Sequence, residues 1–223
     1  MKLTKEGIAV IDGDNYLSAD IVAQGRLDVA RDYLLQFREY IPEGGVVLDI
    51  GACLGDFTAT FSEMVGPTGS VHAYEPYLPV LECLFHNLRT YSNVRIHGIA
   101  LGNSDANASV IVDAYNIGAS YLMSGDGDVT ITTLDRNVAA WNPVRIDFIK
   151  IDAEGYEPLI LDGGIETINR ARPVMLIEID TRALGWTNSQ PSDVHKRLDK
   201  LGYRFERFEG PHGNILCLPK ERS

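Results

Sequence analysis

The sequence predicts an α/β fold built on a doubly wound, mostly parallel sheet. Apolar runs typical of buried strands alternate with helical patterns over residues 46–201, and this alternation favours parallel strands joined by crossover helices. The chain then ends in two more apolar runs on either side of Gly210-Pro211-His212-Gly213. Such a turn between apolar runs predicts a β-hairpin, with the last strand running antiparallel.

The elements follow one another in a regular order. After a polar, turn-rich start, residues 27–41 carry apolar residues at helical spacing until Pro42 and two glycines stop the pattern. We then expect strand 46–50, helix 57–65, strand 70–74, helix 78–91, strand 94–100, short strands 108–113 and 129–133 around an irregular stretch 117–127, strand 146–151, helix 158–169, strand 174–179, helix 194–201 and hairpin strands 203–208 and 215–218.

The composition predicts a globular protein of the cytoplasm. A formal net charge of -11 argues against a nucleic-acid partner, because nucleic-acid binders concentrate Lys and Arg. No membrane partner is expected, since no apolar run approaches the ~18 residues that span a bilayer and the first residues lack the apolar core of a signal peptide. Cys53, Cys83 and Cys217 are widely spaced and are expected to be free thiols. The oligomeric state stays open.

A glycine turn follows the first strand of the alternation. It has the form Asp49-x-Gly51-x-x-x-Gly55, and Glu75 closes the next apolar run twenty residues later. Glycines let the backbone approach a ligand, and an acid at the tip of the second strand suits a ribose diol. The spacing differs from the G-x-G-x-x-G that seats a dinucleotide pyrophosphate. An NAD(P)-dependent oxidoreductase and a non-catalytic binding domain on the same fold remain alternatives.

Acidic residues lie at the ends of four predicted strands. They are Asp49, Glu75, Asp152 and Glu178, and they should converge because ligands bind beyond the carboxyl ends of parallel strands. Glu178 interrupts an apolar strand, where an unpaired charge would cost several kcal/mol, so it needs a partner. Lys150 lies two residues before Asp152 on the same strand face. A structural ion pair of Glu178 with Lys150 and a functional role for Glu178 both remain open.

Several segments together resemble the FkbM family of S-adenosylmethionine (SAM) dependent methyltransferases. They are Leu48-Asp49-Ile50-Gly51-Ala52, Tyr74-Glu75-Pro76, Thr133-Leu134-Asp135 and, as the most specific, residues 146–157 with their I-K-I-D-x-E-G-x-E pattern. The similarity spans roughly residues 40–180 in the same motif order, and the glycine turn resembles the first motif of SAM methyltransferases. Cys53 departs from the pattern, since this family usually has Asn there and other methyltransferases often have Gly.

This resemblance implies a single-domain, Rossmann-like class I SAM methyltransferase, with SAM as cofactor. It implies methylation, mostly at oxygen, of a small molecule, sugar or natural-product intermediate; N-methylation of a small molecule is the alternative. Residues 1–45 would form an N-terminal segment and helix covering the acceptor side, and residues 46–223 the methyltransferase domain. The expected cofactor-binding residues are Asp49, Gly51, Ala52, Gly55, Glu75, Pro76, Leu101 and Asp152.

The expected catalytic residues are Asp152, Glu178, Glu154 and Lys150. A hydroxyl acceptor must lose its proton to a nearby carboxylate or imidazole, or have its pKa lowered by a metal. By resemblance to magnesium-dependent catechol-type methyltransferases, Asp152, Glu178 and Asp180 are candidate ligands of a divalent metal. Lys150 would offset the same charges without a metal, and this version is favoured because no histidine or asparagine beside the acids completes a ligand set.

Aromatic and histidine residues elsewhere receive weaker predictions. His72 and His97 lie within strands and are expected to be satisfied core residues rather than bases. Tyr121, Trp141 and Trp186 lie in or near irregular segments and are candidates for the roof of an acceptor pocket.

Overall fold

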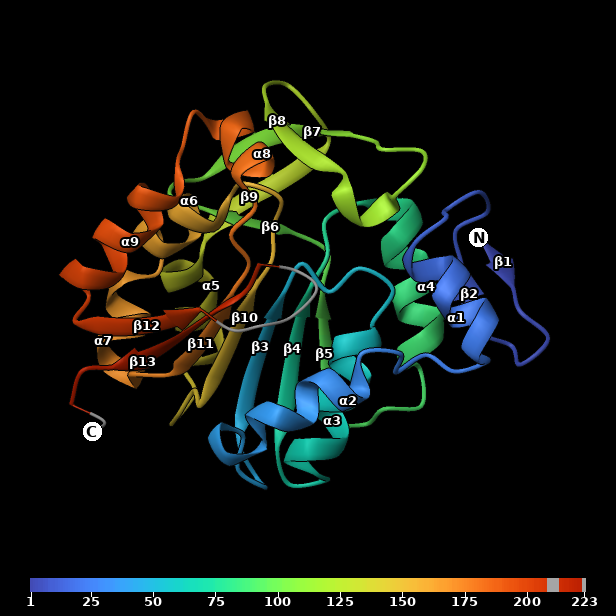
Figure 1. Cartoon of the computed structure of the whole chain (residues 1–223), viewed down its shortest axis with the longest axis horizontal. Helices are drawn as coiled ribbons and strands as arrows, with labels where there is room; N and C mark the ends of the chain where they lie inside the picture. Colours follow the sequence, from blue (N-terminus) through green and yellow to red (C-terminus); the bar gives the residue numbers. More distant parts are fainter. Residues whose placement is uncertain (208–212, 222–223) are drawn as a thin grey trace.

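One large sheet forms the centre of the protein in the computed structural model, which describes residues 1–207 and 213–221. Within these ranges seven strands follow the order β12-β13-β11-β10-β3-β4-β5 (Figure 1). They are β3 (Val46–Ile50), β4 (Ser70–Tyr74), β5 (Val94–His97), β10 (Phe148–Ile151), β11 (Val174–Ile177), β12 (Tyr203–Arg207) and β13 (Ile215–Pro219). All neighbours pair in parallel except β13, which is antiparallel to β11 and β12. The predicted fold class is confirmed.

Helices cover both faces of this sheet. They include α2 (Arg31–Leu34), the 3₁₀ helix η1 (Leu35–Tyr40), α3 (Asp56–Val65), α4 (Leu78–Leu88), α5 (Leu134–Trp141), α6 (Glu157–Asp162), α7 (Ile165–Ala171) and α9 (Pro191–Lys200). Successive strand residues point to opposite faces. Val47 therefore packs in the apolar core formed with α2, η1 and α3, whereas Leu48 packs in the core formed with α5, α6, α7 and α9.

A second, smaller sheet was not predicted. The expected strand 94–100 divides into β5 and β6 (Ala100–Gly102), and β6 joins β7 (Ala106–Ile111), β8 (Tyr121–Ser124) and β9 (Val129–Thr133) in the order β6-β9-β7-β8. The stretch 117–127, expected to be irregular, contains the 3₁₀ helix η2 (Ile117–Ala119) as well as β8. Side chains of this sheet, including Val110 and Leu122, pack against the main core and hold the small sheet in place.

Two predicted helices are wrong in extent. The stripe at 27–41 forms only the short α2 followed by η1, and the helix expected at 158–169 is broken into α6 and α7 at Gly163-Gly164. A β-carbon at Gly163 would lie 1.9 Å from the carbonyl oxygen of Gly102, so the close approach of β6 requires glycine there. Helix α5 was missed, although Thr133 caps it by accepting a hydrogen bond from the Arg136 N–H at 3.1 Å.

The N-terminal segment is anchored beside the carboxyl end of the sheet. It contains β1 (Lys2–Leu3), β2 (Ala9–Val10) and α1 (Leu17–Gln24). The buried Asn87 side chain of α4 accepts from the Ala9 N–H at 2.7 Å and donates to the Ala9 carbonyl at 3.0 Å. Asp14 accepts a hydrogen bond from the Ile117 N–H at 3.1 Å and so ties this segment to η2.

Two further findings concern the predicted C-terminal turn and the length of the helices. The predicted turn at 210–213, with His212, lies outside the described residues except for Gly213. Across residues 1–207 and 213–221, no helix is both long and apolar enough to cross a membrane.

Candidate functional site

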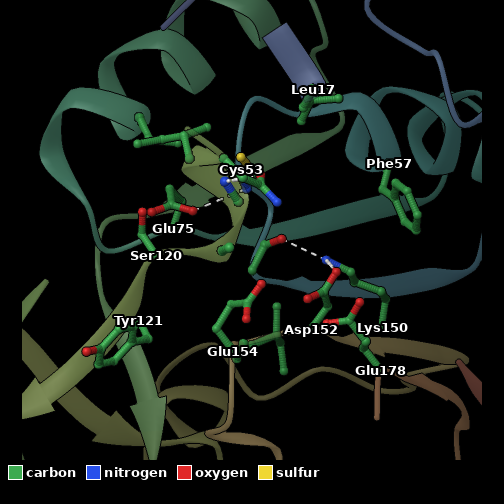
Figure 2. Close-up of a pocket in the computed structure, with 18 of the residues that line it drawn as sticks. Leu17, Cys53, Phe57, Glu75, Ser120, Tyr121, Lys150, Asp152, Glu154 and Glu178 are labelled. Carbon is green, nitrogen blue, oxygen red and sulfur yellow. Dashed lines mark hydrogen bonds and ion pairs between the residues drawn. The ribbon is translucent and has the colours of Figure 1, made fainter. Parts of the chain in front are cut away.

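A cavity of about 940 Å³ lies beyond the carboxyl ends of β3, β4, β10 and β11. Its walls include the loops that follow these strands, helices α1 and α2, and the η2–β8 segment. Ligand cavities are commonly about 300–1,000 Å³, so this one has room for a nucleoside cofactor and a second molecule. Figure 2 shows Glu75 and Cys53 on one side of the cavity, and Lys150, Asp152 and Glu178 gathered on the other.

The two glycines of the turn are required by packing within the protein. Gly51 has φ +81°, and a β-carbon there would lie 1.8 Å from the Asp152 carbonyl oxygen. Gly55 has φ +96°, and its β-carbon would lie 2.9 Å from the Leu84 side chain of α4. Gly51 lines the cavity, whereas Gly55 does not. The motif therefore brings β10 and α4 close to the turn, and only its first glycine lies where a ligand can touch it.

Cys53 also has a left-handed backbone, with φ +47°. Glycine and asparagine adopt this conformation more readily than other residues, which gives a physical reason for the Asn or Gly that the family resemblance leads us to expect here. The Cys53 N–H donates a hydrogen bond of 3.2 Å to Glu75. Burial raises the pKa of the Cys53 thiol well above its ordinary value, so this cysteine stays protonated at neutral pH.

Glu75 presents a nearly buried carboxylate to the cavity. One oxygen accepts from the Tyr77 N–H at 2.8 Å and the other from the Cys53 N–H at 3.2 Å. Burial raises the pKa of Glu75 to about 7, although these hydrogen bonds oppose the shift. The two backbone donors fix the carboxylate while each oxygen keeps a second lone pair for a ligand hydroxyl. Pro76, which follows, also lines the cavity.

Asp49 does not line the cavity but lies fully buried beneath it. Thr58 donates a hydrogen bond of 2.5 Å to one carboxylate oxygen, and the other lies 3.5 Å from Lys150 Nζ. Lys150 Nζ also lies 3.4 Å from Asp152 and donates to the Gly51 carbonyl at 2.7 Å. Burial lowers the pKa of Lys150, but the charges of Asp152 and Asp49 outweigh it and raise that pKa overall. The lysine therefore joins β3 to β10 as a permanent cation.

Asp152, Glu154 and Glu178 form a carboxylate cluster at the other end of the cavity, with one oxygen from each lying within 4.8 Å of the others. Burial, and then the charge of Asp152, raises the pKa of Glu154 to about 8. The same two causes and a hydrogen bond to Asp152 raise the pKa of Glu178 strongly. Both shifts favour the protonated forms of Glu154 and Glu178 near neutral pH.

The structure changes two expectations about this cluster. Asp180 caps helix α8 (Thr181–Leu184), because its Oδ1 accepts from the N–H groups of Arg182 and Ala183 at 2.7 and 3.0 Å. Glu154, rather than Asp180, is the third member of the group that could hold a metal ion. The ion pairs of Lys150 are formed with Asp49 and Asp152, and Glu178 bonds instead to Asp152.

Three cavity residues were missed in the sequence. Asp56, the first residue of α3, is 7% exposed, and burial raises its pKa to about 7. Tyr33 of α2 and the buried Asn214 meet across the cavity, since Asn214 donates a hydrogen bond of 2.8 Å to the Tyr33 hydroxyl. An acid at the start of a helix is commonly explained by its favourable interaction with the helix dipole. The sequence position of Asp56 therefore did not indicate a ligand-binding role. No sequence signal marks Tyr33 or Asn214, because their encounter depends on the tertiary fold.

Other expected residues fall in different places. Leu101 lines the cavity from β6, whereas Ala52 is buried and does not line it. Tyr121 lines the cavity and stacks on Trp186, with ring centroids 4.3 Å apart. Trp141, which was expected in the roof, instead stacks on His72 at 3.8 Å outside the cavity.

The two strand histidines are satisfied core residues, as expected. His72 Nδ1 lies 3.0 Å from His97 Nε2, and the two rings stack between Trp141 and Tyr74. Burial, and then the charge of His97, lowers the pKa of His72 to about 4, so this pair carries no positive charge at neutral pH.

The sheet order, the glycine turn after β3 and the acid after β4 are those of the class I SAM-dependent methyltransferase fold. The chain belongs to the FkbM family within that class, because the model described as Methyltransferase FkbM domain matches residues 49–205. The family identified from the sequence motifs is therefore confirmed. No curated protein matches the chain significantly.

Solved structures similar to the chain agree on the fold. A methyltransferase FkbM from Methylobacillus flagellatus KT is 18% identical, with a TM-score of 0.58, over 90% of this chain and 60% of its own. An O-methyltransferase from Bacillus cereus in complex with SAH is 14% identical, with a TM-score of 0.54, over 86% and 80%. A precorrin-6y C5,15-methyltransferase from Geobacter metallireducens GS-15 is 15% identical, with a TM-score of 0.51, over 97% and 96%. The chain thus spans 60% of the length of the FkbM structure.

Proposed function

We propose that the protein transfers the methyl group of SAM to an oxygen atom of a small molecule, a sugar or a natural-product intermediate. The observation that carries the proposal is that Glu75 and the Asp152 cluster line one cavity within an FkbM methyltransferase domain. Their opposite positions support a cofactor end and an acceptor end. The family resemblance supports oxygen as the acceptor atom.

The residues around Glu75 fit the nucleoside part of SAM. The fixed carboxylate of Glu75 can accept hydrogen bonds from both ribose hydroxyls, and such charge-assisted bonds contribute about 1.5–3 kcal/mol each. Gly51 exposes backbone to the same space, and Pro76 and Leu101 add apolar surface for the base. When bound, SAM supplies a methyl group activated by a positively charged sulfur.

The acceptor end supplies a base and a means of orientation. Asp152 accepts the proton of the acceptor hydroxyl, while Lys150 at 3.4 Å balances its charge. Glu178 keeps its own proton and donates it in a hydrogen bond to Asp152, which orients the base. Alignment of the hydroxyl with the methyl group then contributes much of the rate enhancement. Tyr33 of α2 lies on this side, which supports the expectation that residues 1–45 cover the acceptor.

A divalent metal at Asp152, Glu154 and Glu178 is the other way to activate the hydroxyl. The three carboxylate oxygens are close enough to bind one ion, and oxygen ligands suit magnesium or manganese. We favour the version without a metal, because Lys150 already neutralises Asp152 and protons on Glu154 and Glu178 relieve the remaining repulsion.

Paired acceptors test the proposed reaction directly. Purified protein and SAM are incubated with sugars, hydroxy acids and natural-product intermediates, each beside an analogue whose hydroxyl is replaced by an amine. We expect release of S-adenosylhomocysteine (SAH) with members of the hydroxyl series. Turnover of the amines alone would move the proposal to N-methylation, and failure of the protein to bind SAM or SAH would contradict the cofactor assignment.

Turnover of the wild type and of Asp152→Asn, each measured with and without a chelator, separates the two mechanisms. Without a metal, wild-type turnover survives chelation and the variant loses about 10²–10⁴ in kcat through loss of the general base. With a metal, chelation abolishes wild-type turnover and added magnesium or manganese restores it. A variant with normal turnover in both conditions would remove Asp152 from the reaction.

A further inference from the structure

We propose that Asp56 binds the positively charged α-amino group in the methionyl part of SAM. The proposal rests on the proposed function, because it requires SAM in this cavity. It adds a cofactor-recognition residue outside the set expected from the motifs. It also gives the acid at the start of α3 a role beyond stabilising the helix.

Asp56 combines burial with access to the cavity. It is the first residue of α3, lines the cavity beside Cys53 and Phe57, and is only 7% exposed. Among the described residues, no Lys, Arg or His side chain lies within ion-pair distance of Asp56. A nearly buried carboxylate that faces a cavity without a cation is well suited to a positively charged ligand group.

The other acids around the glycine turn are already engaged. Asp49 is fully buried and contacts Thr58 and Lys150. Lys150 also donates to the Gly51 carbonyl at 2.7 Å, so this backbone acceptor already has a cation partner. Glu75 is held by two N–H groups in the orientation expected for the ribose. This leaves Asp56 as the carboxylate beside the turn that can meet an ammonium group.

The electrostatics of Asp56 support the same assignment. Burial raises the pKa of Asp56 to about 7, although the charge of Lys150 and hydrogen bonds from the backbone N–H groups of Phe57 and Asp56 oppose the shift. Near pH 7, Asp56 is therefore partly protonated in the free protein. An ammonium group beside the carboxylate favours the ionised form, so binding should release a proton from Asp56.

Two nucleosides that differ at the methionyl end test the assignment. SAH carries the amino acid portion, and 5′-methylthioadenosine has the same adenosine and sulfur without it. In calorimetric titrations we expect Asp56→Asn to weaken SAH binding by about 10- to 100-fold, as for loss of a charge-assisted hydrogen bond, and to change methylthioadenosine binding less than about twofold. Asp20→Asn is the matched control, because Asp20 also lines the cavity but is exposed. It should change neither affinity more than about twofold.

Proton release provides a second measurement that a structural role would not affect. Titrations at pH 7 in two buffers of different ionisation enthalpy should show wild type releasing more protons with SAH than with methylthioadenosine. Glu75 should release the same number of protons with both ligands, because both contain the same adenosine. The difference between the two ligands therefore reports the ionisation of Asp56. The difference should vanish in Asp56→Asn, whose melting temperature is measured in parallel.

The outcomes distinguish this inference from the proposed function. If wild type binds SAH and Asp56→Asn binds it equally well, with the same proton release, the role of Asp56 is wrong while the cofactor assignment stands. Equal losses for both nucleosides would also overturn it, because they would indicate general damage to the cavity. If wild type binds neither nucleoside, the proposed function and this inference fail together.

Discussion

Replacing Lys150 with methionine tests how the centre of the site is held together. The lysine ammonium lies 3.5 Å from Asp49 and 3.4 Å from Asp152, but the two contacts are not equivalent. The Asp152 side chain is 34% exposed, so solvent screens that pair and it contributes little to stability. Asp49 is 0% exposed, and Lys150→Met leaves it buried without a cation. Removing one partner of such a pair costs about 3–5 kcal/mol.

This loss should be visible in thermal unfolding. For a chain of this length about 1 kcal/mol corresponds to 2–4 °C, so we expect Lys150→Met to melt about 6–20 °C below wild type at pH 8. The matched double variant, Asp49→Asn with Lys150→Met, removes both charges and keeps an acceptor for the Thr58 hydroxyl. It should recover at least about 2 kcal/mol of the loss.

The pH dependence gives a second check with a defined sign. Burial raises the pKa of Asp49 and the charge of Lys150 lowers it, so the variant raises the folded-state pKa further. An acid with a raised folded pKa binds more protons when folded, and its contribution to stability falls as pH rises from the unfolded pKa of about 3.9 through the folded pKa. The deficit of Lys150→Met should therefore be smaller at pH 5 than at pH 8. A loss below about 1 kcal/mol at pH 8, or no recovery in the double variant, would refute the reasoning.

Three further predictions concern single cavity residues. Glu75→Ala should weaken SAH binding by about 10- to 100-fold in titration calorimetry, through loss of ribose hydrogen bonds, and a folded variant with wild-type affinity would remove Glu75 from the cofactor site. Initial rates at saturating SAM should rise between pH 7 and 9 as Glu154, with a pKa of about 8, loses its proton, because the added negative charge makes the neighbouring Asp152 a stronger base. Glu154→Gln should remove this rise, and an unchanged profile in the variant would exclude the residue. Cys53→Gly should raise the free energy of unfolding by about 0.5–1 kcal/mol because φ at this position is +47°, and a lower melting temperature would show that the cysteine side chain contributes more through packing.

Local patterns were enough to predict the main strands and the family. Strands 46–50, 70–74 and 129–133 have the bounds that the sequence predicted. These segments are short apolar or alternating runs between turn residues, so their signal is contained within the segment itself. The motif order likewise identified the FkbM domain, and the strand-end position of Glu75 and Asp152 placed both beside the cavity.

What the sequence determined by itself is thus the order of the main-sheet strands and of most helices, the family and the edge of the sheet where the acids meet. The tertiary structure alone decided that Lys150 pairs with Asp49, that Glu154 replaces Asp180 in the cluster and that Asp56 faces the cavity. It also decided that Gly163 breaks a helix, because the Gly102 carbonyl approaches it. The physical reason is that each of these features depends on atoms from segments distant in the chain, and a local pattern carries no record of which atoms folding will bring within a few ångströms of one another.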